Sequence, residues 1–126
     1  MTIGETYWFP TPDGIENKRW HTRNMVTGSG GNLVVVSHTV TAGTTFKALY
    51  YSVSGKLGEG VMILQEKIGG VWTDVDALST PQAQHTIQSG LMEPIEFSAG
   101  TEIRIMARNT HTANQMMRIV FMGVEV

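Results

Sequence analysis

Short runs of apolar and polar residues, separated by glycine-containing turns, fill the chain from Leu33 to its end. Such runs are typical of β-strands, and no segment shows the period of an amphipathic helix. Gly69-Gly70 separates two apolar runs by two residues, which favours a tight hairpin. Strands of this spacing predict an all-β sandwich or barrel. We expect eight strands, near residues 33–41, 45–54, 60–68, 71–77, 83–89, 92–98, 102–109 and 115–125.

One stretch of sequence is repeated. Residues 38–49 and 95–106 share a pattern of an apolar residue, Ser or Thr, Ala-Gly-Thr, and then a large apolar residue and a base. We expect Gly43 and Gly100 to supply the open backbone angles where one strand turns into the next. In a chain of eight strands, the repeat indicates two similar Greek-key halves. The predicted fold is therefore an eight-stranded antiparallel jelly-roll β-sandwich.

The first 32 residues lack this periodicity. They contain Pro10, Pro12 and the glycine-rich run Gly28-Ser29-Gly30-Gly31, so we interpret residues 1–32 as an extended N-terminal arm with a hinge and residues 33–126 as the jelly-roll domain. The arm either folds back on its own domain or lies on a neighbouring subunit. Its aromatic and basic residues are the candidate partner-binding set: Tyr7, Trp8, Phe9, Lys18, Arg19, Trp20 and Arg23.

The last predicted strand is apolar on both of its faces, as are residues 33–36 and 61–64. A free antiparallel sandwich normally presents one polar face to water, so apolar residues on both faces favour burial against another subunit. Met116, Val120 and Met122 are the candidate interface, and a homotrimer is the expected assembly. The alternative is that these are central strands covered by the arm.

Composition supports a surface partly covered by other protein. Charged residues make up 16% of the chain, whereas about 25% is usual. The net charge of −2 gives no reason to expect a nucleic acid or a membrane as a partner. The absence of cysteine excludes disulfides and favours synthesis in a reducing cytoplasm. The sequence shows neither a signal peptide pattern nor an apolar run long enough to span a membrane.

Candidate catalytic chemistry is sparse. The four histidines, His21, His38, His85 and His111, show no metal-ligand spacing, and no nucleophile elbow or phosphate-binding loop is present. Glu93 and Glu96 are candidates for a carboxylate pair, but we interpret them as solvated acids. We therefore expect no catalytic residue, no metal and no cofactor, and we predict that the protein is not an enzyme.

One candidate binding site lies in the segment 70–76. Strand alternation would place Val71 and Val75 on the core face, and Trp72, Asp74 and Asp76 together on the outer face. An exposed indole can stack on a sugar ring while carboxylates accept its hydroxyl hydrogen bonds, so these three residues are the candidate glycan-binding set. The alternative is a tryptophan buried at a contact, with the acids in solvent.

The aromatic run Tyr7-Trp8-Phe9, the glycine-rich hinge, the cysteine-free β-domain and the two Ala-Gly-Thr turns together resemble the small jelly-roll auxiliary proteins of tailed bacteriophage virions. These include capsid decoration proteins and head-fibre or tail-tip modules. The resemblance implies a protein made in the host cytoplasm, added to a virion, often trimeric, with the major capsid protein or another virion protein as its partner.

Capsid decoration is accordingly the first functional expectation, and a receptor- or carbohydrate-binding head of a fibre or tail tip is the alternative. Carbohydrate-binding modules also resemble this strand pattern. A third class, a small hydrolase or isomerase of the double-stranded β-helix type, is disfavoured because it requires clustered histidines and glutamates.

Overall fold

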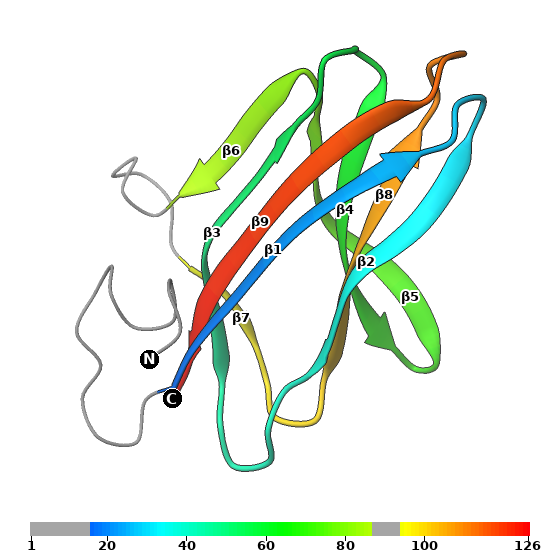
Figure 1. Cartoon of the computed structure of the whole chain (residues 1–126). Coiled ribbons are helices and arrows are strands. Elements are labelled where there is room, and N and C mark those ends of the chain that lie inside the picture. Colours follow the sequence, from blue (N-terminus) through cyan, green and yellow to red (C-terminus); the bar gives the residue numbers. More distant parts are fainter. Residues whose placement is uncertain (1–15, 87–93) are drawn as a thin grey trace.

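Two antiparallel β-sheets face each other in the computed structural model of the chain, which describes residues 16–86 and 94–126 (Figure 1). These residues contain strands and no helix, and so no helix that could cross a membrane. The nine strands are β1 (Glu16–Val26), β2 (Gly31–Thr39), β3 (Phe46–Ser54), β4 (Gly60–Ile68), β5 (Val71–Ser79), β6 (Gln82–Thr86), β7 (Ile95–Phe97), β8 (Glu102–Asn109) and β9 (Gln115–Glu125).

Each sheet combines strands from distant parts of the sequence. The sheet nearer the viewer in Figure 1, called the front sheet below, has the order β1-β9-β3-β6, with β7 also pairing with β3. The back sheet has the order β2-β8-β4-β5. Among the described strands, the chain stays in one sheet only from β4 to β5 and from β6 to β7, and every other connection between consecutive strands passes from one sheet to the other.

The core lies between the sheets and follows the alternation of side chains along each strand. On β8, Ile103, Ile105 and Ala107 are fully buried and point inward, as the sequence pattern predicted. On β9, Ile119 and Phe121 do the same. The predicted all-β sandwich is confirmed, but its strands number nine rather than eight.

The additional strand is β1, and it makes the prediction of an arm over residues 1–32 wrong from Glu16 onward. β1 pairs with β9 over its whole length, from Glu16 opposite Glu125 to Val26 opposite Gln115. The Trp20 ring stacks on Phe121 inside the sandwich, with ring centroids 5.4 Å apart. The sandwich therefore includes Glu16–Val26 and does not begin at Leu33. Tyr7, Trp8 and Phe9 lie outside the described residues.

The glycine-rich run is a tight turn between β1 and β2, and not a hinge. The backbone N–H groups of Ser29 and Gly30 donate hydrogen bonds of 2.7 Å to the carbonyls of His111 and Asn109. A Cβ atom on Gly28 would lie 2.5 Å from the carbonyl oxygen of Thr112. A glycine is needed at position 28 because the β8–β9 loop packs directly against it.

The remaining strands overlap the expected ranges, and the predicted glycine turns are confirmed; residues 87–89 and 92–93 of two expected strands lie outside the described residues. Gly69 and Gly70 connect β4 to β5 with φ angles of 58° and 81°. Gly43 and Gly100 have φ angles of 80° and 81°, each in a connection between the sheets. The two repeated turns also lie beside each other, because Val40 is hydrogen-bonded through its N–H to Thr101 and through its carbonyl to Gly100, at 2.9 Å each.

Candidate functional site

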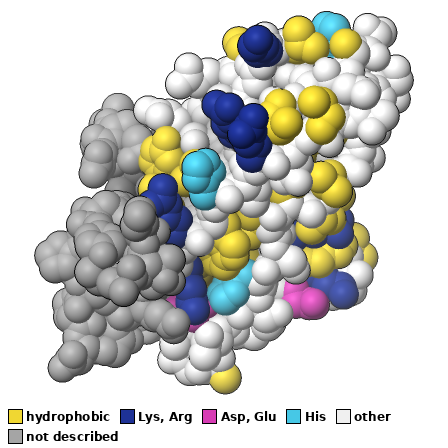
Figure 2. All heavy atoms as spheres, viewed as in Figure 1, with side chains coloured by type: hydrophobic (Ala, Val, Ile, Leu, Met, Phe, Trp, Pro, Cys, Tyr) yellow, Lys and Arg dark blue, Asp and Glu magenta, His cyan; other side chains and the backbone are white. Residues whose placement is uncertain are grey.

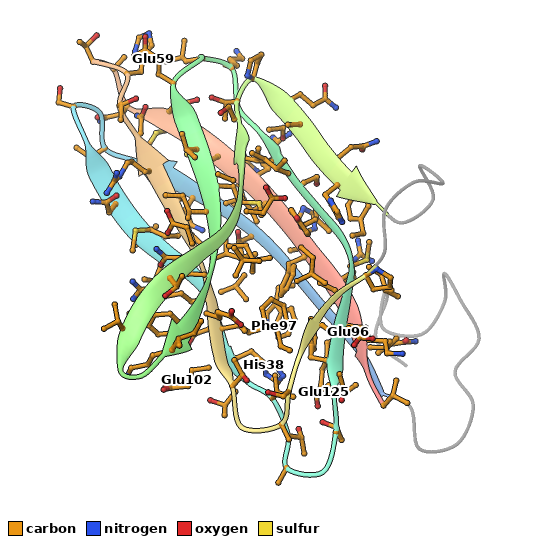
Figure 3. The ribbon with its side chains drawn as sticks, turned by 180° about the vertical axis from the view of Figure 1, so that it is seen from behind. His38, Glu59, Glu96, Phe97, Glu102 and Glu125 are labelled. Carbon is orange, nitrogen blue, oxygen red and sulfur yellow. The ribbon has the colours of Figure 1, made fainter. Side chains whose placement is uncertain are left out.

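A buried carboxylate lies at one end of the sandwich. Glu125 is 1% exposed, its Oε2 accepts a 2.7 Å hydrogen bond from the Thr41 hydroxyl, and its Oε1 is paired with Nε2 of His38. Figure 3 shows His38 and Glu125 pointing toward each other. Burial tends to raise the pKa of Glu125, but the hydrogen bonds from Thr41 and His38 and the charge of Lys18 outweigh it and lower the pKa. Both carboxylate oxygens are occupied, so we interpret the pair as structural.

A second polar contact crosses the middle of the core. The Tyr51 hydroxyl donates a hydrogen bond to Oδ2 of Asp76, and its ring stacks on His85 with centroids 4.6 Å apart. Burial, and then the hydrogen bond to Asp76 and its negative charge, raise the pKa of Tyr51 well above the usual range. The phenol therefore stays protonated and acts as a donor, which suits a structural link between the sheets.

The other candidate catalytic residues are dispersed. His21 is exposed on β1, whereas His111 lies in the β8–β9 loop and accepts a 2.9 Å hydrogen bond from the backbone of Ala113. Glu96 lies 3.6 Å from Lys47, and Glu93 is outside the described residues. Within residues 16–86 and 94–126, no three His, Asp or Glu side chains are grouped as metal ligands.

The predicted glycan-binding set does not share one face. A bulge in the β4–β5 pairing places Asp76 opposite Leu64 and Asp74 opposite Gln65, so Asp76 points into the core while Asp74 points out. Val71, expected in the core, is 65% exposed.

Trp72 lies on the outer face of the back sheet but is not a free stacking surface. The guanidinium carbon of Arg104 lies 4.1 Å from the centre of its ring. Arg104 Nε donates a 2.8 Å hydrogen bond to Gln65, whose amide donates one of 2.7 Å to Asp74. The indole and the carboxylate that were assigned to a sugar are therefore engaged by neighbouring side chains.

The outer face of the front sheet brings together residues that the sequence assigned to two separate sites. Met116, Val120 and Met122, the candidate oligomer interface, point outward from β9 and are half-buried. In the β1–β9 register, Arg19 lies opposite Met122, and Met25 lies opposite Met116. Lys18 and Trp20, assigned to the same arm, lie on the other side of β1, toward Glu125 and Phe121 respectively.

Two arginines lie side by side on this face. Arg23 of β1 is the direct cross-strand neighbour of Arg118 of β9, and both side chains are exposed. Figure 2 shows basic side chains beside hydrophobic ones over the upper part of this face, whereas acidic side chains are visible only near its lower end. Like charges placed directly opposite each other destabilise a sheet, so the pair carries a cost to the isolated fold.

A groove of about 750 Å³ runs beside the arginines, between the ends of β1 and β9 and the β3–β4 loop. A smaller hollow of about 340 Å³, lined by His21, Arg23 and Arg118, lies next to it. The groove is lined by Arg23, Met25, Ser54, Gly55, Lys56, Leu57, Pro81, Gln82, Asn114, Gln115, Met116 and Arg118. The alternation of β9 could have placed Arg118 on the face of Met116, but Lys56 and Pro81 join the groove through loops whose course the sequence does not indicate.

Comparison with known proteins gives a fold and no family. No protein-family model matches the sequence, and no curated protein matches it. The crystal structure of PirA is similar, with a TM-score of 0.51 at 15% sequence identity over 83% of this chain and 92% of PirA. Chains from infectious bursal disease virus also match: the Gx strain has a TM-score of 0.48 at 9% identity and the Gt strain 0.44 at 11%, each over 93% of this chain and about a third of the viral one. At such identities the likeness to PirA shows a shared fold alone.

Proposed function

We propose that this protein is a non-enzymatic virion component, a phage capsid decoration protein that attaches to neighbouring capsid subunits through the outer face of its front sheet. The observation that carries this proposal is the Arg23–Arg118 pair, set among the methionines of the same face. A surface that combines uncompensated positive charge with large apolar side chains lowers the stability of the isolated protein, and a complementary partner would remove that cost.

The proposed fold within the sandwich class is a jelly roll, the fold of many viral capsid domains. The strand orders β1-β9-β3-β6 and β2-β8-β4-β5 support it. Apart from the pairs β4–β5 and β6–β7, consecutive strands lie in different sheets, and the matching turns at Gly43 and Gly100 relate the two halves of the chain. β1 occupies the position that completes a four-strand order in the front sheet.

Self-association belongs to the same proposal. Three copies around an axis of the capsid would bring three such faces together, and Met116, Val120 and Met122 would bury against a neighbouring copy or the major capsid protein. Methionine adapts to irregular surfaces, which suits a contact with non-identical neighbours. Assembly on a capsid would also explain the low share of charged residues, 16% of the chain.

Particle composition tests the proposal. Virions purified on a density gradient from the native source should contain the protein in many copies, in fixed ratio to the major capsid protein. A variant with Met116→Ser and Val120→Ser should fold but be absent from particles, whereas Val34→Ser, an exposed apolar position of the back sheet, should be incorporated normally. Undiminished incorporation of the first variant would exclude this face, and absence of the wild-type chain from every particle would exclude the virion role.

A further inference from the structure

We propose that the groove beside Arg23 and Arg118 binds an acidic peptide segment of the partner protein, with its carboxylates on the arginines and Lys56 and its apolar side chains against Met25 and Met116. The inference rests on the proposed attachment role for the identity of the partner, but the binding chemistry stands on the groove itself.

The first argument is unpaired positive charge. Arg23, Lys56 and Arg118 all line the groove, and none of the acidic side chains in the described parts of the chain lines it with them. The ion pairs His38–Glu125, Lys47–Glu96 and Lys67–Glu102 lie elsewhere and involve none of these three cations. Two guanidinium groups on adjacent strands can each hold a carboxylate through two parallel hydrogen bonds, a geometry that a lysine cannot provide.

The second argument is that the backbone positions carrying these cations are fixed. Arg23 and Arg118 lie on paired strands of the front sheet, and their Cα atoms are in register. The loop that carries Lys56 is fixed on both sides: the N–H of Gly55 donates a 2.8 Å hydrogen bond to Pro81, and the carbonyl of Glu59 accepts hydrogen bonds of 2.9 Å from both the N–H and the hydroxyl of Thr110. Because the backbone on both sides of the groove is already ordered, only the side chains of the site lose conformational entropy when a ligand arrives.

The third argument selects a peptide among anionic ligands. Met25, Leu57, Pro81 and Met116 make one part of the lining apolar, which fits aliphatic side chains. Among the described residues that line the groove none is aromatic, whereas proteins that bind single-stranded nucleic acids stack the bases on aromatic rings. The volume of about 750 Å³ is in the range of ligand sites.

Polar groups in the lining suit a peptide backbone as well. Ser54, Gln82 and Asn114 offer donors and acceptors beside the cations. Gln115 also belongs to the lining, but its side chain is 3% exposed and its Nε2 donates to Gly58 and Asn109, so it supports the fold of the site.

The test uses fluorescence anisotropy with the full-length protein and a labelled nine-residue peptide of alternating Glu and Leu. A Lys-Leu peptide of the same length and a nine-nucleotide oligo(dT) serve as competing probes. We expect the Glu-Leu peptide to bind at low salt, with affinity falling as salt rises. Arg23→Gln with Arg118→Gln should weaken binding at least tenfold, whereas Arg108→Gln, which removes an exposed arginine of the back sheet, should leave it unchanged.

The melting temperature separates lost binding from lost folding. Because the arginines repel each other, Arg118→Gln should melt at or above the temperature of the wild type. The inference is overturned if the Glu-Leu peptide does not bind, if the double variant binds it as well as the wild type does, or if oligo(dT) binds more tightly. Peptide binding by a protein that is absent from virions would overturn the virion role and leave the groove assignment standing.

Discussion

The hydroxyl of Tyr51 on β3 and the carboxylate of Asp76 on β5 form a hydrogen bond across the core, and so link the front sheet to the back sheet from within. The β4–β5 bulge makes this contact, because it turns Asp76 inward in a strand where Asp74 points to solvent. The other carboxylate oxygen of Asp76, Oδ1, accepts a 2.8 Å hydrogen bond from the backbone N–H of Ala77. A bulge that the hydrophobic pattern does not show thus converts an expected surface acid into a core contact.

Tyr51→Phe should lower the free energy of unfolding by about 1–3 kcal/mol, because it removes the hydrogen bond from the buried tyrosine to the partly buried Asp76 carboxylate. Urea denaturation followed by fluorescence measures this loss. Tyr50→Phe is the matched control, since the Tyr50 hydroxyl makes only a long, exposed hydrogen bond of 3.3 Å to Gln84. Equal stability of both variants would mean that the Tyr51–Asp76 contact contributes nothing to the fold.

The raised pKa of Tyr51 should make the stability of the protein depend on pH in the alkaline range. The folded state raises the pKa of Tyr51 above its unfolded value of 10.0, so it retains a proton that the unfolded chain releases. This contribution to stability is complete below pH 10 and declines as the pH rises further. Tyr51→Phe should therefore lose stability less steeply than the wild type above about pH 10. Parallel curves for the two proteins would contradict the raised pKa.

Acid pH should lower the stability of the fold through protonation of Glu125. Its pKa is lower in the folded state than the reference value of 4.5, so its ionised form stabilises the fold above that pH, and the stabilisation is lost as the pH falls through the folded pKa. Glu125→Gln should cost about 1–3 kcal/mol at neutral pH and flatten the acid limb of the stability curve. Glu102→Gln, an exposed partner of Lys67, should change stability by less than about 0.5 kcal/mol.

Gly123 is required by close packing between β9 and β3. A Cβ atom there would lie 2.5 Å from both the Lys47 carbonyl oxygen and the Phe46 ring. Gly123→Ala should therefore lower the free energy of unfolding by about 1–3 kcal/mol, because the ring and the strand must shift. Gly58→Ala, with no atom within 4 Å of its Cβ position, is the control and should be nearly neutral. A small effect at both positions would mean that Phe46 relaxes freely.

The sequence predicted the strands from Leu33 onward because their hydrophobic alternation and their turn glycines agree. It failed at β1, where the inward positions include Thr22 and Asn24 and so hide the period of two. It also misplaced Asp76, because a bulge reverses the alternation without a sequence signal. Of the candidate site, alternation could identify the Met116, Arg118 and Val120 face, but the pairing of Arg118 with Arg23 depends on a contact between distant strands.

Truncation and substitution of β1 test its place in the fold. Deleting residues 1–27 should unfold the domain, because it removes an edge strand that pairs with β9 over its full length. Trp20→Ala should cost roughly 3 kcal/mol, since its ring packs on Phe121 and lies 6.1 Å from Phe46 between ring centroids. His21→Ala, on the exposed face of the same strand, should be nearly neutral. Circular dichroism and urea titration of the three proteins give the answer. A truncated chain that keeps its β-sheet spectrum and its cooperative transition would restore the interpretation of residues 1–32 as a separate arm.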